Sequence, residues 1–171
     1  MNFEAVRAAK NMAEDLGRIH AASWQAAYKG IVPDSYLENF TTQKRAEVFR
    51  KAMAIGSEEY YLFKADGCPA GLALLHKSHE EGMEPTDGEI YAIYVHPDYW
   101  GTPITGMAIR FCVDRLTELG YSRLFIWVLE QNIRARRFYE KHGFLPDGKS
   151  KEIEVGETLI EIRYKMDGSR S

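Results

Sequence analysis

The chain has 171 residues, of which 45% are hydrophobic and 27% are charged, the proportions of a globular protein with an apolar core. This length predicts one domain that spans residues 1–171. The formal net charge is -3 and no run of Lys or Arg exceeds two residues, so the sequence lacks the basic segments that are typical of nucleic-acid-binding proteins.

The two cysteines, Cys68 and Cys112, stand far apart and outside any CxxC pair. Two cysteines are too few for a disulfide framework, which favours a reducing cytoplasm. Residues 1–17 lack the basic start and apolar stretch of a signal peptide, and no segment approaches the length of a membrane span. We therefore expect a cytoplasmic protein without membrane contacts.

Hydrophobic periodicity and turn residues predict an alternation of strands and helices. In chain order, we expect a strand at 2–8, a helix at 11–30, a helical stretch at 34–56 that breaks around 41–42, strands at 59–64, 69–76 and 89–95, a helix at 103–119, a strand at 124–129, a helix at 133–142, and strands at 151–155 and 158–166. Residues 166–171 are expected to form a frayed tail.

Asn11 and Glu14 have the spacing of a helix capping box, and Asp66-Gly67 is a strong signal for a tight hairpin turn. Residues 124–129 are apolar throughout, as in a strand that is buried on both faces. The strand, helix, strand order over residues 89–129 predicts a right-handed crossover between parallel strands. The fold class is therefore α/β (α+β), a mixed central sheet of about six to seven strands with helices on both faces.

The most informative segment is residues 94–106, where a strand runs directly into a helix start. Free N–H groups and the positive end of the helix dipole suit a pyrophosphate there. Gly101 and Gly106 have the outer spacing of a P-loop, but Met107-Ala108 replace the required Lys and Ser or Thr, which disfavours an ATP or GTP site. A plain helix cap, with Thr102-Pro103 as N-cap and first helical residue, explains the same composition.

Three segments resemble those of the GNAT N-acetyltransferases. Residues 94–106 are similar to the family's acetyl-CoA loop, in which V-x-P-x-Y runs into R/Q-x-x-G-x-G/A and a helix. Residues 129–144 resemble the second signature, V-x-x-x-N-x-x-A-x-x-F-Y-E-K-x-G-F, and residues 20–33 are similar to the opening helix of many bacterial members. The matches span residues 2–166 in the expected order.

The resemblance implies a GNAT-like fold in which the strand that ends at Val95 splays from strand 124–129 and acetyl-CoA lies between them. Cofactor contacts are expected from Ile93, Tyr94, Val95, Trp100, Gly101, Thr102, Pro103, Ile104, Thr105, Gly106, Asn132 and Tyr139. Trp100, Pro103 and Thr105 depart from the family pattern of Arg or Gln, Gly, and Gly or Ala. Pro103 has no N–H to donate, whereas the hydroxyls of Thr102 and Thr105 can donate to phosphate oxygens.

By the same resemblance, Tyr139 is the tyrosine that protonates the leaving thiolate; a core tyrosine beside Phe138 is the alternative. The family often places a carboxylate on the strand of Glu89, commonly acting through water. Glu89 is therefore the candidate base, and a solvated residue at the start of the strand is the alternative. Tyr91 and His96 are reserve candidates.

Trp24, Tyr28 and Tyr36 belong to the opening helices, which cover the acceptor side of the cleft in the family. Substrate contacts are expected from Trp24, Tyr28 and Tyr91, although aromatic residues at helical spacing are also typical of a core. No metal site is expected, because His76 and His79 lack further ligands at a sensible spacing.

The expected reaction is direct attack of a primary amine on the thioester of acetyl-CoA, without a covalent enzyme intermediate. A small polyamine, aminoglycoside or amino-acid-like metabolite is the first choice of acceptor, and a protein N-terminus or lysine is the alternative. The alternative from another class is a non-catalytic acyl-CoA-binding or regulatory module, which the departures at Trp100, Pro103 and Thr105 keep open. GNAT proteins are often dimers, so a homodimer is also expected, with the C-terminal strands as the contact.

Overall fold

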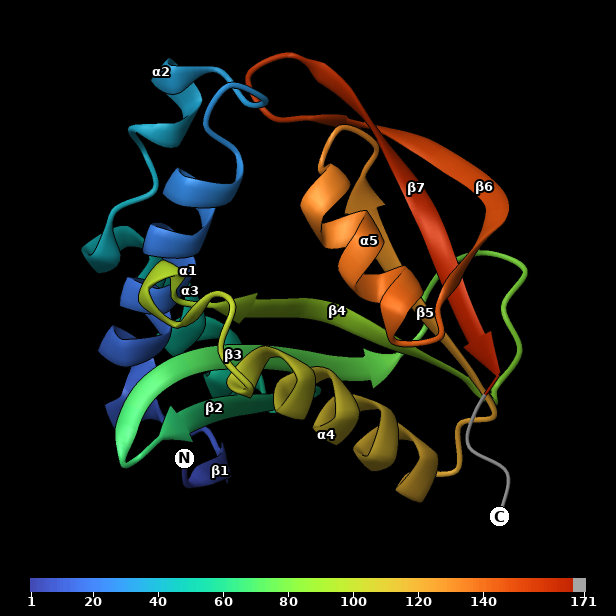
Figure 1. The fold of residues 1–171 in the computed structure, drawn as a ribbon, viewed down its shortest axis with the longest axis horizontal. Helices are drawn as coiled ribbons and strands as arrows, with labels where there is room; N and C mark the ends of the chain where they lie inside the picture. Colours follow the sequence, from blue (N-terminus) through green and yellow to red (C-terminus); the bar gives the residue numbers. More distant parts are fainter. Residues whose placement is uncertain (168–171) are drawn as a thin grey trace.

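The computed structural model describes residues 1–167, which form one seven-stranded mixed sheet with helices on both faces (Figure 1). The strands, in the spatial order β1-β2-β3-β4-β5-β7-β6, are β1 Phe3–Arg7, β2 Glu59–Ala65, β3 Cys68–Lys77, β4 Asp87–Val95, β5 Arg123–Leu129, β6 Leu145–Glu154 and β7 Thr158–Asp167. The helices are α1 Ala13–Ala27, α2 Asp34–Leu37, α3 Thr42–Ile55, α4 Ile104–Glu118 and α5 Ile133–Lys141. The predicted mixed sheet and the parallel β4-α4-β5 crossover are confirmed.

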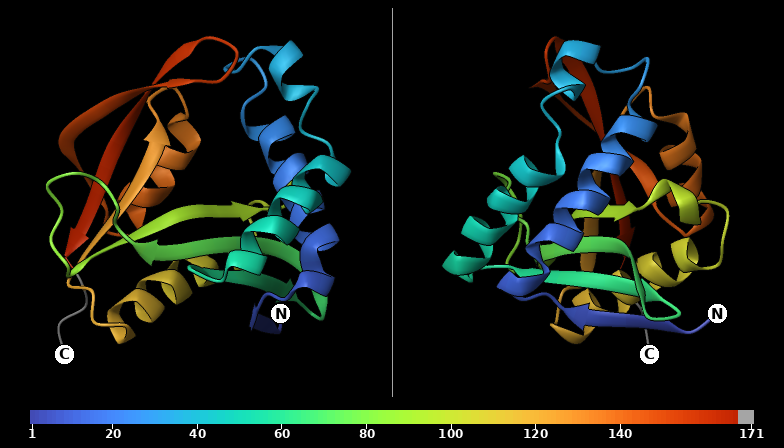
Figure 2. Two further views of the ribbon diagram at one scale, coloured as in Figure 1. Left: turned by 180° about the vertical axis from the view of Figure 1, so that it is seen from behind. Right: turned by 90° about the vertical axis from the view of Figure 1, so that its left-hand side faces the viewer.

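Both faces of the sheet are covered, so neighbouring residues of one strand are buried on opposite sides. Phe63 of β2 belongs to the core cluster on the side of α4 and contacts Phe111 of that helix, whereas Leu62 belongs to the cluster of Leu16 of α1 and Phe49 of α3. Figure 2 shows α1 and α3 on one side of the sheet and α4 and α5 on the other. No helix within residues 1–167 is long and apolar enough to cross a membrane.

Two predicted helix caps are wrong. Asn11 lies inside a 3-10 turn, Lys10–Met12, so Met12 takes the N-cap position of α1 without a side-chain hydrogen bond. At α4 the N-cap is Pro103 rather than Thr102, because the Thr102 hydroxyl is already used inside the preceding loop. The chain before each helix is too tightly turned for the expected capping residue to reach the free N–H groups.

The C-terminal strands are longer than predicted. β6 begins at Leu145 rather than at residue 151. The sequence pattern did not predict this start, because the first residues of β6 are mostly polar and exposed on the edge of the sheet and show no clear alternation. Met166 and Asp167 pair with β5 as the end of β7, so the frayed tail predicted to start at residue 166 is wrong for these two residues. The rest of that prediction, residues 168–171, lies outside the described residues.

The parallel strands β4 and β5 pair only at one end and then separate, which forms a fork. Their register joins Asp87–Glu89 to Arg123–Phe125 and extends no further. At the closed end, the Arg123 guanidinium donates two hydrogen bonds to the Asp87 carboxylate, at 2.8 and 2.7 Å. A Cβ on Gly88 would lie 2.7 Å from the ring of Tyr121. This close packing fixes the point from which the two strands diverge.

The outer end of the fork is closed by the β6–β7 turn, which reaches α2. Val155 of this turn packs with Val32 and Leu37, and a Cβ on Gly156 would lie 2.9 Å from Cβ of Tyr36. Figure 1 shows the turn beside α2 at the top of the molecule. The contact joins the β5-β7-β6 arm to the helices that cover the other arm, so the space between the arms is roofed.

The close approach of α1 and α3 depends on Gly17. A Cβ at this position would lie 2.5 Å from the Ala46 nitrogen and 2.6 Å from the Thr42 oxygen, both backbone atoms that cannot rotate away. We expect Gly17→Ala to lower the free energy of unfolding by about 3 kcal/mol and the thermal midpoint by roughly 6–12 °C. Gly106→Ala is the control, since its nearest neighbour is 3.4 Å away. Equal midpoints for the two variants would contradict the close approach.

Candidate active site

The open edge of β4 faces the inside of the fork. The His96 N–H donates to the Ala70 carbonyl of β3 at 2.8 Å, so in an antiparallel ladder the residues one and three positions earlier, Val95 and Ile93, point their backbone groups away from β3. They therefore point towards β5, which has already diverged. An extended chain placed in the fork would find β-type hydrogen-bonding groups there.

The first cavity, which we term the loop cavity, lies between β4, α5 and the segment that leads into α4. It has a volume of about 390 Å³. Its lining consists of Ser23, Ala27, Tyr28, Ile93, Tyr94, Val95, Trp100, Gly101, Thr105, Asn132, Arg134, Ala135, Phe138 and Tyr139. Many residues with expected cofactor contacts from strand, loop and helix are thus brought together on one surface.

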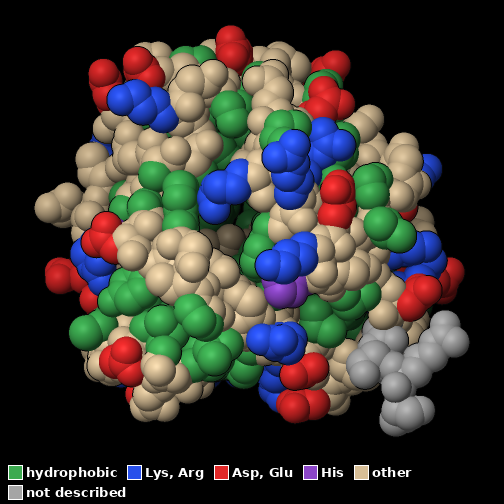
Figure 3. Space-filling view, in the orientation of Figure 1, with side chains coloured by type: hydrophobic (Ala, Val, Ile, Leu, Met, Phe, Trp, Pro, Cys, Tyr) green, Lys and Arg blue, Asp and Glu red, His purple; other side chains and the backbone are tan. Residues whose placement is uncertain are grey.

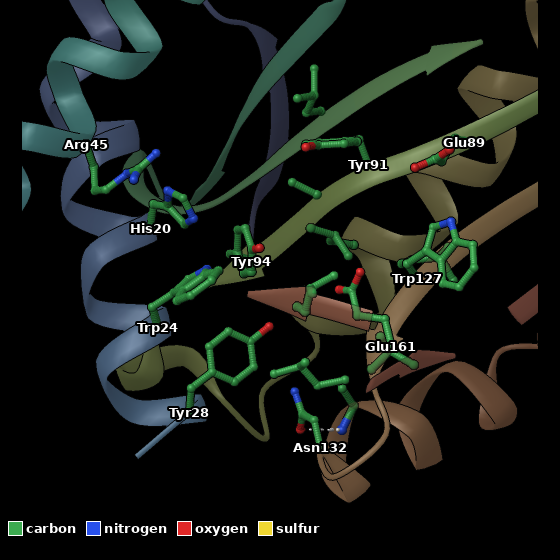
Figure 4. A pocket seen from close by; sticks show the side chains of 18 of the residues that line it. His20, Trp24, Tyr28, Arg45, Glu89, Tyr91, Tyr94, Trp127, Asn132 and Glu161 are labelled. Atoms are coloured by element: carbon green, nitrogen blue, oxygen red, sulfur yellow. Dashed lines mark hydrogen bonds between the residues drawn. The ribbon is translucent and has the colours of Figure 1, made fainter. Parts of the chain in front are cut away.

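The second cavity, which we term the aromatic cavity, lies on the α1–α3 side of the fork and has a volume of about 530 Å³. Figure 4 shows its labelled residues, which come from both arms of the fork and from the helices that cover it. The side chains of Trp24, Tyr28, Tyr91 and Trp127 contribute aromatic lining, and Arg45, Glu89, Lys151 and Glu161 contribute charge. A cavity of this size and lining is typical of a small-molecule site.

The two cavities meet at a set of residues that line both, which we term the junction. The junction consists of Tyr28, Ile93, Tyr94, Asn132, Ala135 and Tyr139. A molecule in the loop cavity and another in the aromatic cavity would therefore face each other at the open part of the fork. This arrangement suits a reaction between two ligands that enter from different sides.

Tyr139 lies at the junction and is only 8% exposed. Burial, followed by the neighbouring Tyr94, raises the pKa of the Tyr139 hydroxyl well above its usual value, so the hydroxyl stays protonated at neutral pH. The ring also contacts Phe138, with ring centroids 5.7 Å apart. Tyr139 is thus packed like a core tyrosine and also lines both cavities, as a residue of the site would.

Asn132 begins α5 at the junction. Its Oδ1 accepts a hydrogen bond from the Ala135 N–H at 3.2 Å, which makes it the N-cap of the helix. The cap fixes the first turn of α5 and, with it, the position of Tyr139 two turns later. Capping and cavity lining are thus combined in one residue.

The loop before α4 uses its own polar groups internally. The Thr102 hydroxyl donates to the Tyr99 carbonyl at 2.6 Å, and the Thr105 hydroxyl donates to the Thr102 carbonyl at 3.1 Å. The expectation that these two hydroxyls donate to phosphate oxygens is therefore wrong for this conformation. The hydrogen bonds of the two hydroxyls stabilise the turn before α4, in which Pro103 and Thr105 replace the family's glycines.

Trp100 replaces the family's Arg or Gln and takes a different role. Its Nε1 donates to the Val95 carbonyl at 2.8 Å, and the Ser23 hydroxyl donates to the same carbonyl at 3.1 Å. The Val95 carbonyl is therefore already satisfied within the protein, and the N–H of Val95 is left for the expected cofactor contact. The guanidinium of Arg134 stacks 3.6 Å from the centroid of the Trp100 ring and brings a cation to the loop cavity.

Four of the expected loop contacts do not line the loop cavity with their side chains: Thr102, Pro103, Ile104 and Gly106. Ile104 is fully buried in the core, and Gly106 faces His142 of the α5 end. Pro103 is exposed to solvent, and the Thr102 hydroxyl bonds within the loop.

Basic side chains extend along α5 beside the loop cavity. Arg134, Arg137 and Lys141 are exposed and follow each other at helical spacing, and Arg110 of α4 lies near the same helix end. Figure 3 shows Lys and Arg side chains over α5 beside a hollow in the surface. This face can hold phosphate groups. From the sequence, that role is expected of the loop before α4 instead.

Glu89 lines the aromatic cavity from β4 and is 5% exposed. Burial, reinforced by the nearby Glu80, raises the pKa of its carboxyl group to about 7. The alternative of a solvated residue at the start of the strand is thus contradicted. A carboxyl group with this pKa can accept and release a proton near neutral pH.

Glu161 is a second carboxylate of the aromatic cavity, and sequence reasoning missed it. It lies on β7 opposite Leu129, whereas Glu89 lies opposite Phe125 at the closed end of the fork. Glu161 is therefore level with the junction, while Glu89 is four residues, roughly 13 Å, from Ile93 along β4. Burial raises the pKa of Glu161. No local signal marked it, because Glu161, Arg163 and Lys165 alternate with apolar residues, as on a half-exposed strand.

Of the two reserve candidates, Tyr91 lines the aromatic cavity and is 64% exposed at its edge. His96 lines neither cavity, and its Nδ1 accepts a hydrogen bond from the Asp98 N–H at 3.2 Å. His96 therefore caps the turn that follows β4, which is a structural role.

The opening helix contributes Trp24 and Tyr28 to the aromatic cavity, as expected for substrate contacts. Trp24 stacks on Phe40 with ring centroids 4.1 Å apart and meets Tyr28 edge-on at 4.6 Å. Tyr36 packs in the cluster under the β6–β7 turn instead and does not line the cavity. The aromatic residues thus divide between cavity wall and core.

Comparison with known proteins gives a consistent result. Residues 18–144 match the model of the acetyltransferase (GNAT) family. The chain is 28% identical over 125 residues to an uncharacterized N-acetyltransferase, YuaI, of Bacillus subtilis, covering 70% of this chain and 67% of that protein.

Two crystal structures have a similar fold. One is the PaiA N-acetyltransferase of Thermoplasma acidophilum in complex with coenzyme A, with a TM-score of 0.71, 19% identity and coverage of 98% of this chain and 99% of the other. The other is yncA, a putative acetyltransferase of Salmonella typhimurium with acetyl-CoA, with a TM-score of 0.72, 15% identity and coverage of 100% and 96%.

Proposed function

The chain belongs to the acetyltransferase (GNAT) family, and from this premise we propose that it transfers the acetyl group of acetyl-CoA to a primary amine of a small molecule. The observation that carries the proposal is the junction, where the loop cavity and the aromatic cavity meet at Tyr139. The PaiA and yncA structures hold coenzyme A and acetyl-CoA, respectively. The homodimer and the cytoplasmic location stay predictions.

The residues around the loop cavity fit acetyl-CoA. The Ile93 backbone and the Val95 N–H point into the fork and offer partners for the amides of an extended arm. Arg134 and the other basic residues of the α5 face offer cations for phosphates. The start of α4 adds the positive end of a helix dipole, although Pro103 supplies no N–H.

A small molecule fits the aromatic cavity better than a protein chain does. The β6–β7 turn meets α2 and roofs the space between the arms of the fork. A peptide acceptor would need a groove along which its backbone could extend, whereas an amine of metabolite size needs only the volume of about 530 Å³. We therefore favour a small acceptor over a protein N-terminus or lysine.

Bound acetyl-CoA supplies the acetyl thioester that the amine attacks. Tyr139 Oη donates a hydrogen bond to the sulfur as it departs. Because burial keeps the pKa of Tyr139 far above that of a thiol, the hydroxyl stabilises the developing negative charge by hydrogen bonding more than by complete proton transfer.

The amine reaches the site as an ammonium and must lose a proton. Glu161, level with the junction, attracts the ammonium form. Glu89, with a pKa of about 7, accepts the proton through water, because it is too far along β4 for direct contact with an amine at the junction. The two carboxylates thus divide binding and proton acceptance between them.

Calorimetry with acetyl-CoA, followed by a thiol-release assay over a panel of amines, tests this function. The proposal predicts saturable binding and acetylation of at least one small amine. Binding without turnover over the panel would favour the non-catalytic module, and the absence of both binding and turnover would contradict both functions.

The role of Arg134 gives a separate prediction. Arg134→Gln removes a cation from the loop cavity, so we expect the Kd for acetyl-CoA to rise about tenfold and to depend less on salt. Calorimetry at two salt concentrations measures both changes. Arg50→Gln on α3 is the control, because Arg50 is paired with Glu47 at 2.8 Å on the exposed side of that helix. An equal Kd in both variants would remove Arg134 from the phosphate site.

A further inference from the structure

Arg45 of α3 is a cation that lines the aromatic cavity without a counter-charge. Within residues 1–167 its guanidinium forms no ion pair, and its Nε is buried without a hydrogen-bond partner. The guanidinium lies 4.8 Å from the centroid of the Phe40 ring. Removing a cation partly from water without a partner costs free energy. An anion bound beside Arg45 would offset that cost.

Another buried polar atom on this side of the cavity, Nδ1 of His20, has no hydrogen-bond partner in the described part of the chain. The Trp24 side chain is a hydrogen-bonding neighbour of the Tyr94 hydroxyl. Burial, together with the charge of Arg45, lowers the pKa of His20 to about 3, so its ring is neutral at physiological pH. Figure 4 shows Arg45, His20 and Trp24 near one another on the side of α1 and α3. One cation among neutral polar groups is the chemistry of an oxyanion site.

The opposite side of the cavity is acidic. Glu89 and Glu161 line it, and Figure 4 shows Glu161 beside Trp127, across the cavity from Arg45. Lys151, the cation on this side, is bound to Glu80 at 3.1 Å and lies over the Trp127 ring at 4.2 Å. The cavity therefore has a free positive charge on one side and negative charge on the other.

We propose that the acceptor is an amino acid, with its carboxylate paired to Arg45 and its amine directed to the junction beside Glu161. The proposal rests on the acetyltransferase function and names its substrate class. Polyamines and aminoglycosides carry only positive charge and would be repelled by Arg45. Aromatic rings line the cavity on the Arg45 side, namely Phe40, Phe49 and Tyr60. The amino acid therefore has an apolar or aromatic side chain.

Matched pairs of substrates test the proposal. The common amino acids are each compared with the amine formed by their decarboxylation, for example phenylalanine with phenethylamine and tyrosine with tyramine, in the thiol-release assay. We expect at least one acid to exceed its amine tenfold or more in kcat/KM. Arg45→Gln should lower kcat/KM for that acid about a hundredfold and should not lower kcat/KM for the amine, because the amine has no carboxylate to lose and is repelled less. Arg45→Lys should restore part of the loss for the acid. Arg50→Gln on the same helix is the control.

Each outcome decides the proposal. Preference for the amines, or an equal effect of Arg45→Gln on acid and amine, would overturn it. So would a lack of turnover for every acid by protein that binds acetyl-CoA. Protein that does not bind acetyl-CoA would instead contradict the proposed function itself. If Arg45→Gln fails to fold, judged by its thermal midpoint, Arg45→Lys must retain the preference for the acid.

Discussion

Replacing Tyr139 by Phe is expected to lower kcat about a hundredfold while the Kd for acetyl-CoA changes less than about twofold. The substitution removes one hydroxyl and keeps the ring that packs against Phe138, so the fold and the cavity walls should persist. The lost group is the hydroxyl that we assign to the departing sulfur. Thiol release gives kcat, and calorimetry with acetyl-CoA gives the Kd.

Tyr121→Phe is the matched control. Tyr121 packs against Gly88 at the closed end of the fork and lines neither cavity, so its hydroxyl should not matter for turnover. Equal kcat values for the two variants would remove Tyr139 from the mechanism. A large rise in Kd for Tyr139→Phe would show that its hydroxyl serves cofactor binding instead.

Replacing Glu89 by Gln should remove the acidic limb of the pH profile of kcat/KM. The raised pKa means that Glu89 is protonated below about pH 7 and cannot accept a proton there. Activity of the wild-type protein should therefore rise with pH through about 7 and level off above it. The amide cannot accept a proton at any pH, so we expect a roughly hundredfold lower rate on the plateau.

The variants Glu161→Gln and Glu81→Gln make this test specific. Glu161→Gln should keep the limb near pH 7 and raise KM, since it removes attraction for the ammonium. Glu81→Gln changes an exposed loop residue and should resemble the wild type. A limb that persists in Glu89→Gln would come from the amine itself, and a limb lost only in Glu161→Gln would make Glu161 the proton acceptor.

Local sequence signals predicted the elements whose geometry is set locally. Asp66-Gly67 forms the expected hairpin turn, with φ of 51° and 83°, because this dipeptide tolerates the left-handed region that a two-residue turn requires. Asn132 caps α5 because its side chain reaches the N–H of Ala135. The continuous apolar run of β5 correctly indicated a strand with two covered faces.

The parts of the site that could not be predicted depend on contacts between distant segments. Arg134 meets Trp100, and Arg45 lines a cavity with Glu161, only because the fork, α3 and the C-terminal strands converge. No spacing along the chain encodes such neighbours. The Thr102 hydroxyl illustrates the reverse case. Its residue type suits a phosphate donor, but in the folded loop the hydroxyl donates to the Tyr99 carbonyl.

The central claim is that acetyl-CoA lies in the loop cavity with its acetyl end at the junction, facing an acceptor in the aromatic cavity. A crystal structure of the protein with coenzyme A tests this claim most directly. We predict the thiol among Tyr28, Asn132 and Tyr139, and the phosphates on the α5 face near Arg134. A cofactor bound outside the fork, with the junction filled by side chains, would contradict the account.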